Sequence, residues 1–207
     1  MAPSSLRRNN AGRVLLAGAG CFLVLALAVM LVKPFPGDAT ARGWVLGFGS
    51  PWVVQAARVV NHLGSWQVLL PLTLALFVVF PSARRRWWIW LALMIAAPIA
   101  EGLLKILIGR ARPEEASMGF PSGHATAAAA FFGAVIYLAA GLPRTARTIV
   151  RAASLVLVVL VALARIILRA HWPVDTLAGI ALGLALASLA TLLADIDPAS
   201  DTRRAGV

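Results

Sequence analysis

Charged side chains are scarce in this sequence. Only 13% of the 207 residues are charged, 60% are hydrophobic and the mean hydropathy is +0.85. This composition offers too little polar surface to cover a soluble globule, so it favours a protein that lies in a lipid bilayer. Acidic residues are particularly few, eight against 19 lysines and arginines, which leaves a net charge of +11. The basic residues form small groups between apolar runs rather than one polar face, which disfavours nucleic acid as a partner.

Cysteine is almost absent. The single cysteine, Cys21, excludes an internal disulfide, and its place inside an apolar run predicts that it packs as a small hydrophobic residue. The connections between the apolar runs also lack a cluster of carboxylates with metal-ligand spacing. We therefore expect neither a metal ion nor another cofactor.

Long apolar runs, by contrast, are abundant. Six stretches approach the roughly 20 residues that cross a hydrocarbon core of about 30 Å: 14–32, 66–80, 88–108, 122–141, 148–167 and 174–194. The short second run is expected to extend backward through "NHLGS". The first run follows arginines as a signal peptide would, but it is too long and no small-residue cleavage site follows, so we expect it to be retained. The sequence predicts an all-α, polytopic membrane protein with a six-helix domain over 14–194, flanked by cytoplasmic tails at 1–13 and 195–207.

The arginines predict the orientation of these helices. They precede the first run, and they lie between the second and third runs and between the fourth and fifth. Under the positive-inside rule these segments and both chain ends are cytoplasmic. The connections at 109–121 and 168–173 then lie together on the outer face of a bacterial-type cytoplasmic membrane.

Two further patterns concern packing. The stretch 51–64 reads as an amphipathic helix in the outer interface, with a polar face of Gln55, Arg58 and Asn61 or His62. We expect His62 to be solvated rather than to bind a ligand. In the last run, Gly179 and Gly183 form a GxxxG pattern that predicts close helix packing.

Ionisable residues interrupt the apolar runs near the two outer connections. They are Glu101 and Lys105 late in the third run, Arg165 late in the fifth and Asp175 early in the sixth. Charge at membrane depth is costly, so it marks a functional site or a paired structural group. Glu101 precedes Lys105 by four residues and is expected to pair with it. Because both connections lie on one side of the membrane, a single site can collect these groups.

The residue types gathered there suit a phosphate. The cationic donors are Lys105, Arg112 and Arg165, and a guanidinium fork fits a tetrahedral oxyanion. In "PSGH", Ser122 is placed as the N-cap of a helix and Gly123 permits close approach of the backbone, which together with the helix dipole makes an anion seat. His124 follows on the first turn, where it can give a proton to a leaving oxygen.

The second histidine has a carboxylate close behind it in the stretch "HWPVD". Pro173 suits the first turn of a helix, and the four-residue offset brings Asp175 back to the ring of His171. A carboxylate on one imidazole nitrogen fixes the tautomer and leaves the other nitrogen as a nucleophile.

These residues resemble a known family. "KILIGRARP" at 105–113, "PSGH" at 121–124 and "ARIILRAHWPVD" at 164–175 are similar, in order and spacing, to the three-part signature of the type-2 phosphatidic acid phosphatases, whose fold is shared with vanadium haloperoxidases. The resemblance implies His171 as the nucleophile that forms a phosphohistidine, Asp175 as its orienting partner and His124 as the general acid. It implies no metal, and it implies a set of phosphate binders: Lys105, Arg112, Ser122, Gly123 and Arg165.

The sequence departs from the signature at one position, because Ala164 stands where the family has a serine before the arginine. The departure removes a hydroxyl that would contact the phosphate or support Arg165. Other polar residues lie near the site outside the signature: Arg110, Glu114, Glu115 and Arg169. Each of the four would contact either a lipid headgroup or water, and Arg169 is the strongest candidate for a contact with the substrate.

The function expected from this resemblance is an integral membrane lipid phosphatase that hydrolyses a lipid phosphomonoester or pyrophosphate. Phosphatidic acid, phosphatidylglycerol phosphate, undecaprenyl pyrophosphate, a lipid A phosphate and other isoprenoid phosphates all fit, and the short connections favour a small headgroup. The nearest alternative is a lipid phosphotransferase that uses the same phosphohistidine. A transporter would explain charges in the membrane but not the gathering of three cations and two histidines at one face, and a haloperoxidase suits a lipid-facing site poorly. The oligomeric state stays open.

Overall fold

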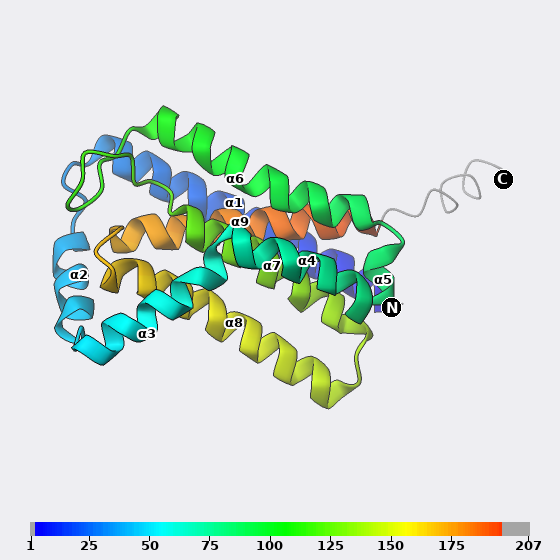
Figure 1. The fold of residues 1–207 in the computed structure, drawn as a ribbon. Helices are drawn as coiled ribbons and strands as arrows, with labels where there is room; N and C mark the ends of the chain where they lie inside the picture. Colours follow the sequence, from blue (N-terminus) through cyan, green and yellow to red (C-terminus); the bar gives the residue numbers. More distant parts are fainter. Residues whose placement is uncertain (1–2, 196–207) are drawn as a thin grey trace.

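The computed structural model describes residues 3–195, and its side chains from residue 7 onward. The chain forms a bundle of helices: α1 (Pro3–Leu31), α2 (Asp38–Gly47), α3 (Pro51–Asn61), α4 (Trp66–Val79), α5 (Pro81–Arg84), α6 (Trp87–Ile108), α7 (Gly123–Leu138), α8 (Arg144–Ile167) and α9 (Pro173–Ala194). Two short 3-10 turns, η1 (His62–Gly64) and η2 (Ala139–Gly141), follow α3 and α7. The long helices run side by side, and α2 crosses one end of the bundle (Figure 1).

Within the described residues, five helices are long and apolar enough to span a membrane, and a bent pair of helices makes a sixth if it is counted as one broken span. The broken span is formed by α3 with η1 and by α4, which meet at an angle of 53°. The predicted all-α, polytopic fold is therefore confirmed. The second run does not extend backward through "NHLGS" as a continuous helix: α4 begins at Trp66, and Ser65 adopts an extended conformation (φ −95°, ψ 149°) between η1 and α4. The amphipathic stretch at 51–64 forms a helix of its own, α3, as predicted.

The predicted cytoplasmic tails stay a prediction. Helix α1 begins at Pro3 and so includes most of the predicted 1–13 tail. The predicted tail at 195–207 lies, beyond Asp195, outside the described residues. Helix α2 had no counterpart in the predictions, because ten residues of mixed polarity after a proline- and glycine-containing turn carry no span-length signal.

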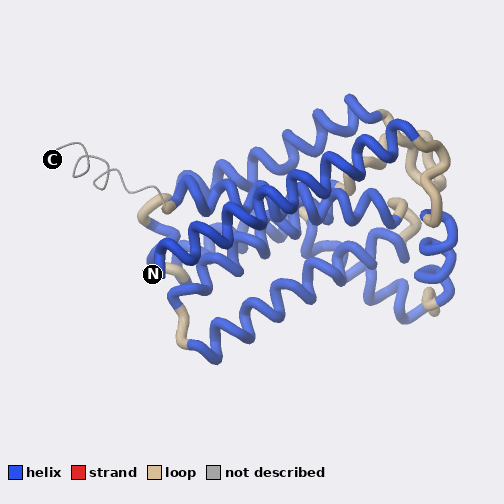
Figure 2. Tube along the Cα trace, turned by 180° about the vertical axis from the view of Figure 1, so that it is seen from behind, coloured by secondary structure: helices blue, strands red, loops and turns tan. Residues whose placement is uncertain are grey.

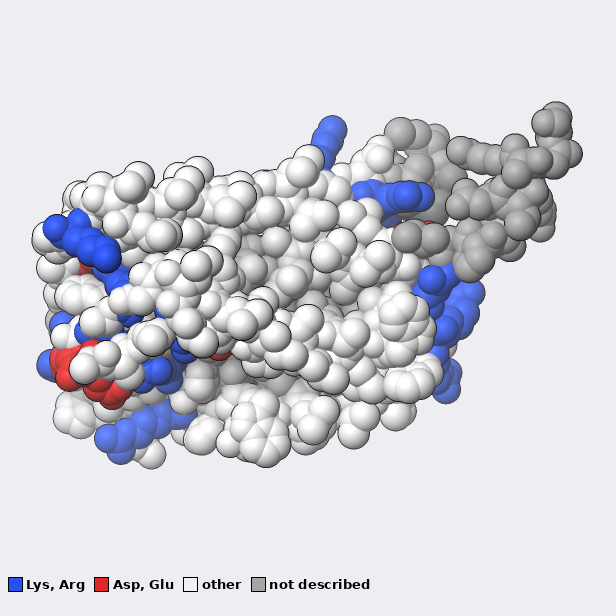
Figure 3. Space-filling view, turned by 90° about the horizontal axis from the view of Figure 1, so that it is seen from above, with Lys and Arg blue, Asp and Glu red and all other residues white. Residues whose placement is uncertain are grey.

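The exterior matches a lipid environment. Lys and Arg gather towards the two ends of the molecule, and a largely uncharged band lies between them (Figure 3). Large apolar side chains are exposed along this band, such as Leu23, Val78 and Leu107. Cys21 is also exposed on α1. It does not pack in the protein core as a small hydrophobic residue; an exposed thiol in the apolar band is compatible with lipid.

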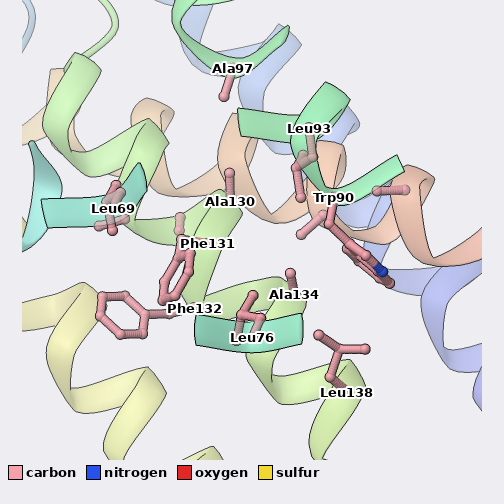
Figure 4. Packing of buried hydrophobic residues seen from close by; sticks show 14 of the residues in the cluster. Leu69, Leu76, Trp90, Leu93, Ala97, Ala130, Phe131, Phe132, Ala134 and Leu138 are labelled. Carbon is pink, nitrogen blue, oxygen red and sulfur yellow. The ribbon is translucent and has the colours of Figure 1, made fainter. Parts of the chain in front are cut away.

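The core is centred on α7. Ala130, Phe131 and Phe132 of α7 pack against Leu69 of α4 and Leu93 of α6 (Figure 4). A second cluster joins α1 to α9 and includes Phe120, whose ring centroid lies 6.0 Å from that of Phe22. This second cluster fixes the residue just before the "PSGH" stretch.

Small residues bring α9 against the beginning of α7. A Cβ at Gly183 would lie 2.4 Å from the carbonyl oxygen of Thr126, and one at Gly179 would lie 2.7 Å from that of Ser122. No larger residue fits without movement of the backbone, so the predicted role of Gly179 and Gly183 in helix packing is confirmed. The contact places the first turns of α7 and α9 next to each other.

Candidate active site

The two connections that carry the predicted site residues lie at the same end of the bundle. Figures 1 and 2 show the segment between α6 and α7 beside the segment between α8 and α9, at the end opposite to the N-terminus. The first of these segments is closed by a bridge between Ala111 and Met118, and the amide of Arg112 donates to the carbonyl oxygen of Ser117 at 3.0 Å. The two connections thus meet at one end of the bundle, as the prediction that they lie on the same side of the membrane requires.

A cavity of about 1040 Å³ opens at this end. Six of the predicted site residues line it: Lys105, Arg112, Gly123, His124, Arg165 and His171. Its remaining wall is mostly apolar and comes largely from α4 and α6, including Leu70, Met94 and Ile99. The end of α3 and η1 add Asn61 and the exposed His62 to the wall. The structure thus joins a cationic pocket to an apolar groove between two membrane helices.

Several buried polar atoms in and beside the cationic pocket lack a hydrogen-bond partner among the described residues. They include Nε of Arg112 and Nε of Arg165, which line the cavity, and Oγ of Ser122, which precedes the lining residue Gly123. Ser122 occupies the N-cap of α7 as predicted, but its fully buried side chain makes no capping hydrogen bond. Unpaired buried donors are rare in folded proteins and indicate a missing ligand, and here their chemistry fits an oxyanion.

Arg165 is held by a residue that the signature does not contain. Its Nη1 donates to Oδ1 of Asn61, at the end of α3, over 2.8 Å. Ala164 is 2% exposed. Asn61 therefore gives Arg165 a hydrogen-bond acceptor in a protein that has Ala164 instead of the family serine. The sequence showed Asn61 on the polar face of the amphipathic stretch at 51–64, but nothing in the sequence connected Asn61 with Arg165.

His171 and Asp175 lie next to each other at the start of α9. Nδ1 of His171 is 3.5 Å from Oδ2 of Asp175, which also accepts the amide N–H of Trp172 at 3.0 Å. Oδ1 of the same carboxylate accepts from Nη1 of Arg110 at 2.5 Å. Asp175 is fully buried and does not line the cavity, whereas His171 does. The two residues are neighbours, as the sequence predicted, at an ion-pair distance that does not form a hydrogen bond to Nδ1 of His171 in the described structure.

Burial also sets the protonation of His171. Desolvation lowers the pKa of His171 below its ordinary value, and the neighbouring Asp175 opposes this effect only in part. The imidazole is therefore neutral at neutral pH, as a nucleophile must be.

His124 lies on the first turn of α7 and faces the same cavity. The turn is packed tightly, since a Cβ at Gly64 of η1 would lie 2.8 Å from the carbonyl oxygen of His124. Glu101 and Lys105 form the predicted ion pair. The glutamate also packs on Gly123, where a Cβ would come within 2.8 Å of its Oε1. The glycine thus makes room for Glu101, in addition to the approach to a ligand that the sequence predicted.

Acidic residues form the rim of the site. Glu115 accepts from Arg112 at 3.0 Å and from the hydroxyl of Ser117 at 2.9 Å, and these contacts lower its pKa, the serine hydrogen bond most. Glu114 joins Arg42 of α2 to Arg169, and the hydrogen bond from Arg42 is the main cause of its lowered pKa.

Two of the basic residues outside the signature do not reach the cavity wall. The side chain of Arg169 is 60% exposed and contacts Glu114, and Arg110 is buried behind the site against Asp175. No cluster of three or more His, Cys, Asp or Glu suited to a metal ion occurs in the described part of the chain.

Comparison with known proteins gives consistent matches. The model of the PAP2 superfamily matches residues 86–196. The chain is 30% identical over 176 residues to "Phosphatidylglycerophosphatase B" of Bacillus subtilis, covering 80% of this chain and 87% of the relative. It is 32% identical over 153 residues to "Decaprenylphosphoryl-5-phosphoribose phosphatase" of Mycobacterium tuberculosis, covering 67% and 79%, and 28% identical over 210 residues to "Lipid A 1-phosphatase" of Rhizobium johnstonii, covering 86% and 81%.

A solved structure agrees with these sequence matches. The transmembrane PAP2 type phosphatidylglycerolphosphate phosphatase from Bacillus subtilis superposes with a TM-score of 0.74 at 28% identity, covering 85% of this chain and 94% of the other.

Proposed function

Because the chain belongs to the PAP2 superfamily and is a membrane lipid phosphatase, we propose that it hydrolyses a lipid phosphomonoester through a phosphohistidine at His171. The reaction takes place at the outer face of the cytoplasmic membrane. The observation that carries the proposal is the unpaired buried Nε atoms of Arg112 and Arg165, in the wall of the cavity that His171 and His124 also line and that continues into an apolar groove. Positioning and charge stabilisation are what phosphoryl transfer chiefly requires.

The first step of the proposed reaction forms a covalent intermediate. The carboxylate of Asp175 near Nδ1 favours the tautomer with the proton on Nδ1, so the lone pair is on Nε2. Nε2 of His171 attacks the phosphorus, and the bond between phosphorus and the lipid oxygen breaks. His124 gives its proton to that oxygen, so the leaving group departs as a neutral alcohol. The arginines and Lys105 stabilise the charge on the phosphoryl oxygens.

The second step releases phosphate. A water molecule gives its proton to the now neutral His124 and attacks the phosphorus, and the bond to Nε2 of His171 breaks. The products are inorganic phosphate and the enzyme in its starting protonation state. His124 thus serves as acid and then as base, and it lines the cavity, as this role requires.

The apolar part of the cavity supports a lipid as substrate. It extends along α6 from Lys105 to Leu91, about 21 Å at the helical rise of 1.5 Å per residue. The polar end of the cavity lies at the end of the bundle, where the headgroups of a bilayer would be. A lipid would therefore bind with its phosphate in the cationic pocket and a hydrocarbon chain between α4 and α6.

The membrane side and the headgroup are parts of the same proposal. The arginines at the opposite end of the bundle, such as Arg84 and Arg144, favour that end as cytoplasmic, which puts the site outside and both chain ends inside. A small headgroup is favoured because the connections over the site are short. Phosphatidylglycerophosphate comes first among the candidates, since a similar sequence and a similar solved structure, both from Bacillus subtilis, are named for that substrate.

The test is phosphate release from a panel of lipid phosphates by the purified protein in detergent. His171→Ala should lower turnover by several orders of magnitude, as loss of a covalent nucleophile does. His124→Ala should retain turnover of substrates with good leaving groups, because these need less protonation. Acid-labile, alkali-stable ³²P on the wild-type chain after quenching, and its absence from His171→Ala, would mark the phosphohistidine. Equal losses for both variants on every leaving group would contradict the division of roles.

A further inference from the structure

An ionic network lies behind the proposed nucleophile. Arg110 donates from Nη1 to Oδ1 of Asp175 and from Nη2 to Oδ2 of Asp38, each at 2.5 Å. The side chains are 13%, 0% and 5% exposed, respectively. None of the three lines the cavity. A single buried guanidinium therefore bridges two buried carboxylates, a geometry that the planar fork of arginine permits.

Asp38 has a second contact that ties the network to α9. Its Oδ1 accepts the amide N–H of Val174 at 3.0 Å, in the first turn of that helix. The first amide groups of a helix have no partner within the helix, so a carboxylate there satisfies a free donor and favours the helix dipole. Asp38 belongs to α2, far from α9 in the sequence. The same carboxylate thus holds Arg110 and the turn that carries Asp175.

The residue beside His171 is clamped from the same side. The ring of Trp172 lies 5.5 Å from the guanidinium carbon of Arg110 and 5.6 Å from that of Arg42, both within the range of cation–π attraction. Arg42 differs from Arg110 in its carboxylate partner, because it contacts Glu114 on the rim rather than Asp175. Helix α2 is docked on the segment 171–175 by these contacts.

From this arrangement we propose that Arg110 and Asp38 are positioning residues for the nucleophile, an inference that rests on the proposed role of His171. The carboxylate of Asp175 is held in two directions, by Arg110 at Oδ1 and by the amide of Trp172 at Oδ2. Held in this way, Oδ2 faces Nδ1 of His171. Without Arg110 the carboxylate loses its charged partner and can rotate away from the imidazole, which then loses the orientation needed for attack.

Arg110→Gln is the central test, in the full-length protein in detergent. We expect kcat to fall by about 10–100-fold, the range seen when outer-shell partners of metal-binding histidines are removed. KM and competitive inhibition by inorganic phosphate should stay within about threefold, the size of a neutral substitution. Inhibition by vanadate should weaken by more than inhibition by phosphate, because vanadate mimics the five-coordinate phosphorus and so depends on the bond to the nucleophile.

Two more variants test separately the two-pronged hydrogen bonding of Arg110 and its ion pair with Asp38. Arg110→Lys keeps the charge but not the fork, so it should lie between Arg110→Gln and the wild type. Asp38→Asn keeps an acceptor for the amide of Val174 but removes the charge, so it should lower kcat in the same direction with little effect on the fold. The double variant of Arg110→Gln and Asp38→Asn should lose less than the product of the single losses, because both act on one network.

Arg42→Gln is the matched control, since Arg42 stacks on the same ring of Trp172 but does not contact Asp175. It should change kcat by less than about threefold. An equal loss in Arg42→Gln would overturn the proposal in favour of general docking of α2. So would unchanged kinetics in Arg110→Gln, or a parallel loss of phosphate and vanadate affinity.

The folded state of each variant is checked by gel filtration and thermal unfolding. If Arg110→Gln does not fold, Asp38→Asn and Arg110→Lys test the proposal by the same criteria.

Different results would refute the positioning role and the proposed function. No phosphate release by the wild type from any lipid of the panel would refute the function itself. Turnover that depends on His171 but not on Arg110 would refute only the positioning role.

Discussion

The hydrogen bond between Asn61 and Arg165 gives a quantitative prediction. Asn61→Ala removes the acceptor that lies 2.8 Å from Nη1 of Arg165. A hydrogen bond to a charged group contributes about 1.5–3 kcal/mol. At about 1.4 kcal/mol per factor of ten, its loss in the transition state would lower kcat/KM by about 10- to 150-fold. We expect the lower half of this range, because Arg165 borders the cavity and water can replace the lost acceptor.

The assay is phosphate release from phosphatidylglycerophosphate in detergent micelles, together with inhibition by vanadate. Both kcat/KM and vanadate affinity should fall, because Arg165 contacts the phosphoryl oxygens in the proposed mechanism. Gln55→Ala is the matched control: Gln55 is an exposed polar residue on the same helix, α3, and does not line the cavity. Unchanged kcat/KM and vanadate affinity in a folded Asn61→Ala protein would refute the reasoning.

Ala164→Ser extends the test to the position where the sequence departs from the family. In the wild type we expect no gain, because Arg165 already has an acceptor and a hydroxyl at this 2% exposed position must fit into close packing. In the Asn61→Ala background the new hydroxyl should restore part of the lost kcat/KM. A tenfold gain from Ala164→Ser alone would show that Asn61 does not replace the missing serine.

The remaining predictions concern topology, pH, packing and metals. With the native cysteine replaced, a membrane-impermeant thiol reagent should label Ser117→Cys but not Ser82→Cys in intact cells, and the opposite pattern would place the site in the cytoplasm. Because burial lowers the pKa of His171, the nucleophile stays neutral below the usual imidazole value of about 6.5, and the acid limb of kcat/KM should have its midpoint below that pH; a midpoint above it would contradict the assignment. Gly183→Ala should destabilise the protein by about 1–3 kcal/mol through overpacking, seen as a lower Tm in detergent, whereas Gly102→Ala, with no atom within 4 Å of the added Cβ, should not. Phosphate release should persist in excess EDTA and fall with vanadate; loss in EDTA with recovery in magnesium would require a metal-dependent mechanism.

Much of the site could be predicted because its signals are local in the sequence. The four-residue offset between Glu101 and Lys105 sufficed to predict their ion pair, since neighbours at that spacing share a helical face. In the same way, the sequence sufficed to predict Ser122 as the N-cap of α7 and Pro173 in the first turn of α9. That the two outer connections meet followed from the count of membrane spans between them.

The bend before α4 and the existence of α2 were not predictable in this way. A run of apolar residues shows that a segment suits the membrane, but it does not show where neighbouring helices force the chain to change direction. Helix α2 is too short for a span signal and is held by contacts to other elements, among them Asp38 to Arg110.

By itself, the sequence determined the membrane environment, the approximate bounds of the long apolar helices and the gathering of the signature residues at one end of the bundle. Only the tertiary structure decided the supports of those residues. Asn61 and Arg165 are 104 positions apart, and Arg110 is 72 positions from Asp38 and 65 from Asp175. No periodicity or spacing links such positions, because their contacts depend on how separate helices dock. Buried charges require partners wherever the fold can supply them, so these supports were selected by the packing of α2, α3 and α9.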